Sequence, residues 1–273
     1  MALDLTGVNE KLLAFDKLVK EGVAAPFEGN LRVGVDLGTA NIVLSVVDEN
    51  NNPIAGITKR SRVVRDGIVV DYVGAVAAVT QMKQELESRL GIPLTHAAAA
   101  IPPGIIEGNA RCMSNVVEGA GFIVSQMVDE PTAASNVLGI KSGAVVDVGG
   151  GTTGISILKD GEVIFTGDEP TGGFHMTLVL AGYHNLSTDD AEEMKQDTTQ
   201  EHMVFPIIRP VVEKMAQIVS RYMSGYSVDE IYIVGGACCF SEFDKAFEKY
   251  VGVPAIKPAV PLLVTPLGTA MNG

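Results

Sequence analysis

The chain has 273 residues, of which 47% are hydrophobic and 19% are charged, which is enough for about two domains or one bilobed body. Its 20 Lys and Arg residues against 33 Asp and Glu residues give a net charge of -13 at pH 7. Such a charge repels phosphate backbones and anionic headgroups, so nucleic acid and membranes are disfavoured as partners.

The sequence also disfavours a membrane or secreted protein. No apolar run approaches the roughly 18 residues of a spanning helix, and charges interrupt the N-terminal segment where a signal peptide is apolar. The three cysteines and four scattered histidines show neither a disulfide framework nor metal-ligand spacing. We therefore expect a reduced, cytoplasmic protein.

Residues 1–29 differ in pattern from the rest of the chain. Val8, Leu12, Phe15 and Val19 recur at helical spacing, and the segment then gives way to the linker-like run VAAPFEGN. This pattern predicts an amphipathic N-terminal extension. Two interpretations stay open, a helix that lies on the main body and a dedicated docking peptide.

From residue 31 the periodicity changes to that of strands. Three short β-rich runs separated by turns, LRVGVD, NIVLSVVD and PIAGIT, are typical of a meander. Helical periodicity comes next and ends at Gly91 and Pro93. The elements predicted after the meander are a helix at 73–90, a strand at 95–101, a helix at 109–119, a strand at 122–129 and a helix at 130–139.

A similar order of elements begins again at residue 143. The run GAVVDVGGGTTGISILKDGEVIFTG predicts strand, glycine turn, strand, tight turn and strand. Farther on we expect helices at 171–182, 188–197 and 203–224, a strand at 230–236, a helix at 241–250 and a closing helix near 265–270. Two similar halves predict an α/β protein with two lobes, one formed by 30–142 with a C-terminal helix at 263–273, the other by 143–262.

Each half carries an aspartate at the end of a strand, followed by glycine and threonine. Residues 36–39 are DLGT, and residues 147–152 are DVGGGT. Glycine lets the backbone approach an anion, and successive N–H groups form a positive nest, so such turns suit phosphate. Asp36 and Asp147 would face each other across a cleft and hold Mg2+ through its waters. The alternative is a hairpin that merely turns the chain, and the duplication argues against it.

The sequence excludes two other kinds of phosphate-binding motif. Gly149, Gly151 and Gly154 satisfy G-x-G-x-x-G, but a dinucleotide-binding fold needs a helix next, and the residues after this run predict a β-hairpin. No G-x-x-x-x-G-K-[ST] is present, which excludes the Walker type. Because neither turn contains a lysine, a triphosphate would need Mg2+ for most of its charge compensation.

With these residues in view, the chain resembles the superfamily of actin, sugar kinases and DnaK-type chaperones. The resemblance covers residues 31–273 and rests on five motifs in order, VGVDLGTANIVLSVV, MVDEPTAAS, VVDVGGGTTGISIL, IYIVGGACCFSEFDKAFE and VTPLGTAMNG. These resemble two phosphate loops, two connecting helices and the adenosine-binding strand and helix. The resemblance implies a duplicated actin-like (ribonuclease H-like) ATPase fold, with two lobes around a nucleotide cleft, minimal inserts, and ATP or ADP with Mg2+ as ligands.

The resemblance also implies roles for particular residues. Asp36 and Asp147 would lie near the metal, and Glu130 near the attacking water; a helix-capping carboxylate is the alternative for Glu130. Glu192 and Lys195 resemble a ribose-contacting pair of bacterial actin relatives, with an exposed charged helix face as the alternative. The other nucleotide-binding residues that it implies are Gly38, Thr39, Asn41, Gly149, Gly150, Gly151, Thr152, Thr153, Gly235 and Gly236.

The chain departs from the chaperone pattern at two positions. Ala40 replaces a hydroxyl residue in the first loop, and Cys239 stands where chaperones place an arginine that stacks on adenine. Both departures bear on nucleotide affinity.

These features predict an ATP-binding protein whose lobes close on Mg-ATP, hydrolyse it slowly if at all, and use the closure to bind or release a protein partner. Over its length the chain is similar to chaperone-like members encoded with ethanolamine-degrading enzymes. That similarity implies ethanolamine ammonia-lyase or a component of its bacterial microcompartment as the partner. A filament protomer, a pseudo-ATPase adaptor and a small-molecule kinase are the alternatives, and the sequence leaves the oligomeric state open.

Overall fold

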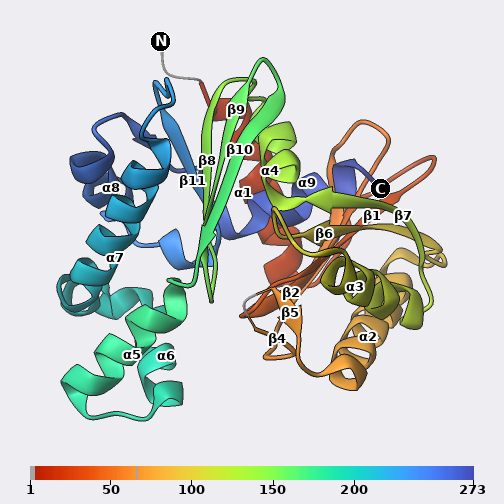
Figure 1. Cartoon of the computed structure of the whole chain (residues 1–273). Helices are drawn as coiled ribbons and strands as arrows, with labels where there is room; N and C mark the ends of the chain where they lie inside the picture. The colour runs from red at the N-terminus through yellow and green to blue at the C-terminus, as the bar shows by residue number, and fades with distance from the viewer. Residues whose placement is uncertain (1–3, 66) are drawn as a thin grey trace.

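The computed structural model describes residues 4–65 and 67–273. These residues form two five-stranded β-sheets that lie side by side (Figure 1). Helices α4 (Glu130–Leu138) and α9 (Val264–Met271) run between the sheets, and further helices cover their outer faces (Figure 1). The result is an α/β molecule with two lobes.

The first sheet has the strand order β3-β2-β1-β6-β7. Its strands are β1 (Arg32–Leu37), β2 (Asn41–Val47), β3 (Pro53–Arg60), β6 (His96–Ile101) and β7 (Ile123–Asp129). β1, β2 and β3 form an antiparallel meander, and β6 and β7 extend the sheet in parallel from β1. Together with α2 (Tyr72–Leu90) and α3 (Glu107–Gly119), this sheet is called the first lobe.

The second sheet repeats this arrangement with the order β10-β9-β8-β11-β12. Its strands are β8 (Gly143–Val148), β9 (Thr153–Lys159), β10 (Glu162–Glu169), β11 (Ile231–Val234) and β12 (Ala255–Ile256). Again three strands form an antiparallel meander and two join in parallel. The predicted tight turn is present, since Asp160 and Gly161 both have positive φ, at 56° and 88°.

Four helices belong to this second lobe and lie on its outer side (Figure 1). They are α5 (Gly173–His184), α6 (Thr188–Gln196), α7 (Glu201–Met223) and α8 (Phe243–Val251). All four helices contribute to one core with β8, β9 and β11, and α5 and α6 also pack against each other and against α7. The matching order of strands confirms the duplicated α/β fold that the sequence predicts.

Sequence periodicity explains the outer helices, as α2 illustrates. Ala75, Val79, Met82, Leu86 and Leu90 recur at intervals of three or four residues and are all buried. The side chain of Asp71 caps the first turn, and Gly91 ends the helix in the left-handed conformation. The buried residues form the core of the first lobe with β1 and β2.

The connecting helices α4 and α9 cross in direct backbone contact. A Cβ at Gly268 would lie only 1.9 Å from the carbonyl oxygen of Ala133, so this crossing requires glycine. Apolar residues of both helices form a third core with β2, β8 and β11, between the two lobes. The helices therefore couple the lobes through one tight contact.

The N-terminal helix α1 (Thr6–Glu21) packs against this central region. Leu12 and Phe15 are fully buried, and the Phe15 ring lies on Gly56 of β3, where a Cβ would be 2.5 Å from the ring. The amide of Ala259 donates to Asn9 Oδ1 at 2.8 Å, so α1 also contacts the segment that leads into α9.

Several short elements were not predicted. They are the hairpin of β4 (Val64–Arg65) and β5 (Ile68–Val69), strand β12, and the 3-10 helices η1 (Thr198–Gln200), η2 (Gly236–Cys238) and η3 (Pro261–Leu263). Elements of two or three residues are too short to show a period. None of the helices within residues 4–65 and 67–273 has the length and apolar character needed to span a membrane.

Candidate functional site

A cavity of about 430 Å³ lies between the lobes. Both glycine turns, the start of α4, the side of α6 and the turn after β11 line it. The predicted site residues that line it are Asp36, Gly38, Thr39, Asn41, Glu130, Asp147, Gly149, Gly150, Gly151, Thr152, Glu192, Lys195, Gly235 and Gly236. Its volume lies in the range of small-molecule sites.

Thr153 is the exception among the predicted residues. It is buried in β9, and its hydroxyl donates to the carbonyl of Thr171. It does not line the cavity. The alternation of side chains along a strand explains this, because Thr152 ends the turn and Thr153 is the first strand residue.

The second glycine turn is built as a cradle. Within it, the Gly149 amide donates to the Thr152 carbonyl at 3.0 Å, while the carbonyls of Gly149 and Gly150 accept from the first amides of α5. Among the described residues, no group accepts a hydrogen bond from the amides of Gly150 and Gly151. Those N–H groups remain for an anion.

Glycine is also required beside Asp147. Gly235 follows β11 with φ at 94°, and a Cβ there would lie 2.4 Å from Asp147 Oδ1. The hydroxyl of Thr265 in α9 donates to Asp147 Oδ2 at 3.2 Å. Asp147 is thus held between β11 and the second connecting helix.

Glu130 takes its position from the start of α4. The preceding residue, Asp129, caps the helix by accepting from the Thr132 amide at 3.0 Å, and Pro131 occupies the first turn. Glu130 therefore lines the cavity from a fixed helix end, together with the two glycine turns.

The carboxyl groups of Asp36, Asp147 and Glu130 are all buried at the cavity, and all three have raised pKa values. Burial, with the neighbouring Asp147, raises the pKa of Asp36 to about 7. Burial raises the pKa of Asp147 to about 6, although the hydrogen bond from Thr265 opposes the rise. Burial and the charges of Asp147 and Asp36 raise the pKa of Glu130 well above its usual range. A cation in this cavity would favour the ionised form of all three.

A hydrated divalent cation fits these residues better than a directly ligated one. In the described part of the chain, no three His, Cys, Asp or Glu residues converge closely enough to hold an ion. Magnesium keeps several of its waters in proteins, so Asp36 and Asp147 would contact it through water.

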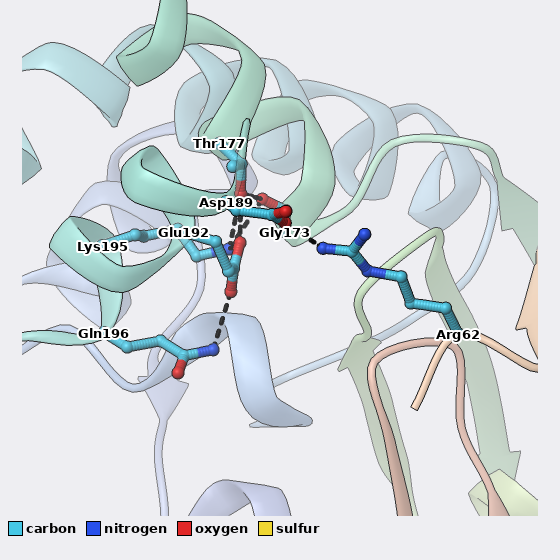
Figure 2. A network of polar contacts seen from close by, with 7 residues as sticks. All are labelled: Arg62, Gly173, Thr177, Asp189, Glu192, Lys195 and Gln196. Atoms are coloured by element: carbon cyan, nitrogen blue, oxygen red, sulfur yellow. Dashed lines mark hydrogen bonds and ion pairs between the residues drawn. The ribbon is translucent and has the colours of Figure 1, made fainter. Parts of the chain in front are cut away.

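Glu192 and Lys195 form a second polar group at the side of the cavity (Figure 2). Lys195 Nζ lies 2.7 Å from Glu192 Oε2 and donates to the Gly173 carbonyl at 3.0 Å and to Thr177 Oγ1 at 2.9 Å. Burial would raise the pKa of Glu192, but the Lys195 charge holds it below its usual value. The pair is fixed by α5, so it is more than an exposed charged face.

One ion pair joins the lobes beside this group. Arg62, in the loop after β3, reaches Asp189 of α6 (Figure 2). Their side chains are 73% and 64% exposed. The sequence did not indicate this pair, because the two residues lie far apart in the chain.

The sequence interpretation also missed Asp168, Ser156 and Gly154, which line the cavity from β9 and β10. Their neighbours Asp147 and Glu130 were predicted. The position of Asp168 could be sought by counting residues along β10 from the 160–161 turn. The irregularity in β10 changes that count by one residue.

Two lobes of equal topology, with paired aspartate and glycine turns facing one cavity, define an actin-like ATPase fold. The family described as "Type IV pilus assembly protein PilM" matches residues 113–258. The MreB5 structure from Spiroplasma citri bound to AMPPNP has a TM-score of 0.70 at 16% identity, over 89% of this chain and 96% of that one. At this identity the likeness shows the fold.

Closer similarity is found among ethanolamine utilization proteins. EutJ from Salmonella typhimurium is 42% identical over 244 residues, which cover 89% of this chain and 86% of that protein. The crystal structure of EutJ from Carboxydothermus hydrogenoformans has a TM-score of 0.94 at 43% identity and covers 98% of both chains. The chain belongs to the EutJ family of ethanolamine utilization proteins.

Proposed function

We propose that this protein binds ATP or ADP with Mg2+ between its lobes and uses lobe closure to bind or release a protein partner in ethanolamine utilisation. One observation carries the proposal: two glycine turns from facing lobes bring Asp36 and Asp147 to one cavity. The AMPPNP complex of the MreB5 relative supports nucleotide as the ligand.

Different residues of the chain would bind different parts of the nucleotide and its Mg2+. The amides of Gly150 and Gly151 would bind phosphate oxygens, and the Glu192–Lys195 pair would contact the ribose. Asp36 and Asp147 would hold the waters of Mg2+, which supplies positive charge against the phosphates.

Slow hydrolysis is consistent with the carboxylates. Glu130 would orient the attacking water as a general base, which requires its ionised form. Burial and the charges of Asp147 and Asp36 raise the pKa of Glu130, and a cation in the cavity would oppose that rise. A bound cation would therefore favour the ionised form of Glu130.

Closure is supported by contacts between the lobes and between the connecting helices. The Arg62–Asp189 ion pair joins the loop after β3 to α6, and α4 and α9 meet at Gly268 and Ala133. A partner responds to closure only if it binds the open and closed states with different affinity.

The proposed partner is ethanolamine ammonia-lyase or a component of its microcompartment, and the proposed location is the cytoplasm or that compartment. Family membership supplies the ethanolamine pathway. The similarity of MVDEPTAAS to the first connecting helix of chaperones supports a chaperone-like action on the partner.

Limited proteolysis and partner capture together test this function. Mg-ATP should protect the segments next to α4 and α9, and the amount of ethanolamine ammonia-lyase captured should differ between Mg-ATP and Mg-ADP. Equal capture of the partner with and without nucleotide would favour a pseudo-ATPase adaptor. Light scattering that depends on nucleotide, without capture of the partner, would favour a filament protomer. Digestion that is identical with and without nucleotide would contradict closure.

A further inference from the structure

A row of three residues crosses the second sheet at the floor of the cavity. The strand register pairs Asp147 of β8 with Gly154 of β9, and Gly154 with Asp168 of β10. Residues paired in this way share one face of a sheet. All three line the cavity, so the two aspartates flank a position that carries no side chain.

The geometry places the Asp168 carboxylate over this gap. A Cβ at Gly154 would lie 3.5 Å from Asp168 Oδ1. Asp168 therefore leans across Gly154 toward Asp147. Its charge is one of those that raise the pKa values of Asp147 and Glu130, in accord with this proximity.

An irregularity in β10 brings Asp168 to this face. The register between β9 and β10 shifts by one between Val163 and Phe165. Without the shift, Gly154 would pair with Gly167, and Asp168 would point to the opposite face. The bulge thus aims a carboxylate at the cavity.

Ser156 supplies an independent observation at the same place. It lies two residues after Gly154 on the same strand face, lines the cavity and is completely buried. Among the described residues, none forms a hydrogen bond with its Oγ. A buried hydroxyl without a partner is costly, so a water or ligand atom is expected beside it.

We propose that Asp168 and Ser156 are further cation-site residues of this protein, which hold the water shell of the nucleotide-bound Mg2+ from the β9–β10 side, opposite Asp147. Asp168 accepts hydrogen bonds from these waters across the gap at Gly154. Ser156 Oγ binds a water at the floor of the cavity. This inference rests on the proposed nucleotide function and extends it to residues on two other strands.

The test measures the Mg2+ concentration that gives half-maximal ADP binding, by calorimetry on the full chain. Outer-shell residues typically change metal affinity about 10- to 100-fold, so Asp168→Asn should raise this midpoint by about tenfold or more. Ser156→Ala should raise it less. ADP binding in EDTA should be the same in the wild type and both variants.

Glu162→Gln is the matched control, because Glu162 is an exposed carboxylate at the far end of the same strand. Its midpoint should equal that of the wild type. A wild-type midpoint in Asp168→Asn, with wild-type ADP binding, would overturn this inference alone. Absence of any Mg2+-dependent binding in the wild type would overturn the proposed function and this inference with it.

Discussion

Ala40 in the first glycine turn lies directly against Gly150 in the second. A Cβ at Gly150 would be 2.9 Å from the Ala40 Cβ and 3.3 Å from the Ala40 amide nitrogen. The two turns therefore meet beside the cavity without space for a side chain at Gly150. This contact requires glycine at position 150.

Gly150→Ala should separate the two turns and weaken Mg-ATP binding by about tenfold, which corresponds to about 1.4 kcal/mol. Calorimetry measures the affinity. Gly182→Ala is the control, since Gly182 lies in a helix with nothing within 4 Å of a Cβ, and it should bind as the wild type does. Unchanged affinity in Gly150→Ala would show that the contact is unimportant for binding.

Gly235→Ala should abolish Mg-dependent nucleotide binding, because the new Cβ would displace Asp147 Oδ1. Gly139→Ala is the matched control: Gly139 also has a positive φ, at 70°, but open space around it. Both substitutions should lower stability, by about 1 kcal/mol or more, since alanine is strained at positive φ. If both variants bind nucleotide equally well, Gly235 does not position Asp147.

The metal-free protein should lose stability as the pH rises from about 4 to about 7. The pKa values of Asp36 and Asp147 are about 7 and about 6, whereas unfolded aspartates titrate near 3.9. In this range the folded state therefore binds more protons than the unfolded state, and the free energy of unfolding falls with rising pH.

Urea unfolding in EDTA at about pH 5.0, about pH 6.0 and about pH 7.5 measures how the free energy of unfolding changes with pH. The double variant Asp36→Asn, Asp147→Asn should have a flatter profile. If the free energy of unfolding falls as steeply with rising pH in the double variant, other groups cause the pH dependence.

The Arg62–Asp189 ion pair should affect closure more than stability. Exposed pairs contribute little to folding, and the side chains are 73% and 64% exposed. Arg62→Ala should leave the melting temperature nearly unchanged but speed nucleotide release, measured by stopped-flow fluorescence. The charge-swapped variant Arg62→Asp, Asp189→Arg should restore slow release. Wild-type release from Arg62→Ala would mean that the pair does not retain the nucleotide.

The duplication made most of this fold predictable from the sequence. Because both halves carry an aspartate before a glycine turn, the two similar lobes and the meeting of Asp36 with Asp147 at one cavity followed from one repeated pattern. Glu130 was predicted from the resemblance of the EPTAAS segment to the chaperones, and the structure places it at the start of α4.

The missed residues depend on features that have no local signal. Asp168 reaches the cavity only because β10 shifts its register by one residue. Arg62 and Asp189 come from separate lobes, and Thr153 turns away because side chains alternate along β9. A pattern of residue types predicts strands and turns, but such placements depend on the packed structure.

Thermal melting of the wild type with Mg-ATP, Mg-ADP, ATP with EDTA, and buffer tests the central claim of a Mg-dependent nucleotide site. Ligand at about 100 times its Kd stabilises a protein by about 2.7 kcal/mol, which corresponds to several degrees for a chain of this size. We predict a rise in melting temperature that needs both Mg2+ and nucleotide and that is lost in Asp147→Asn. No shift at millimolar nucleotide would contradict the proposed function.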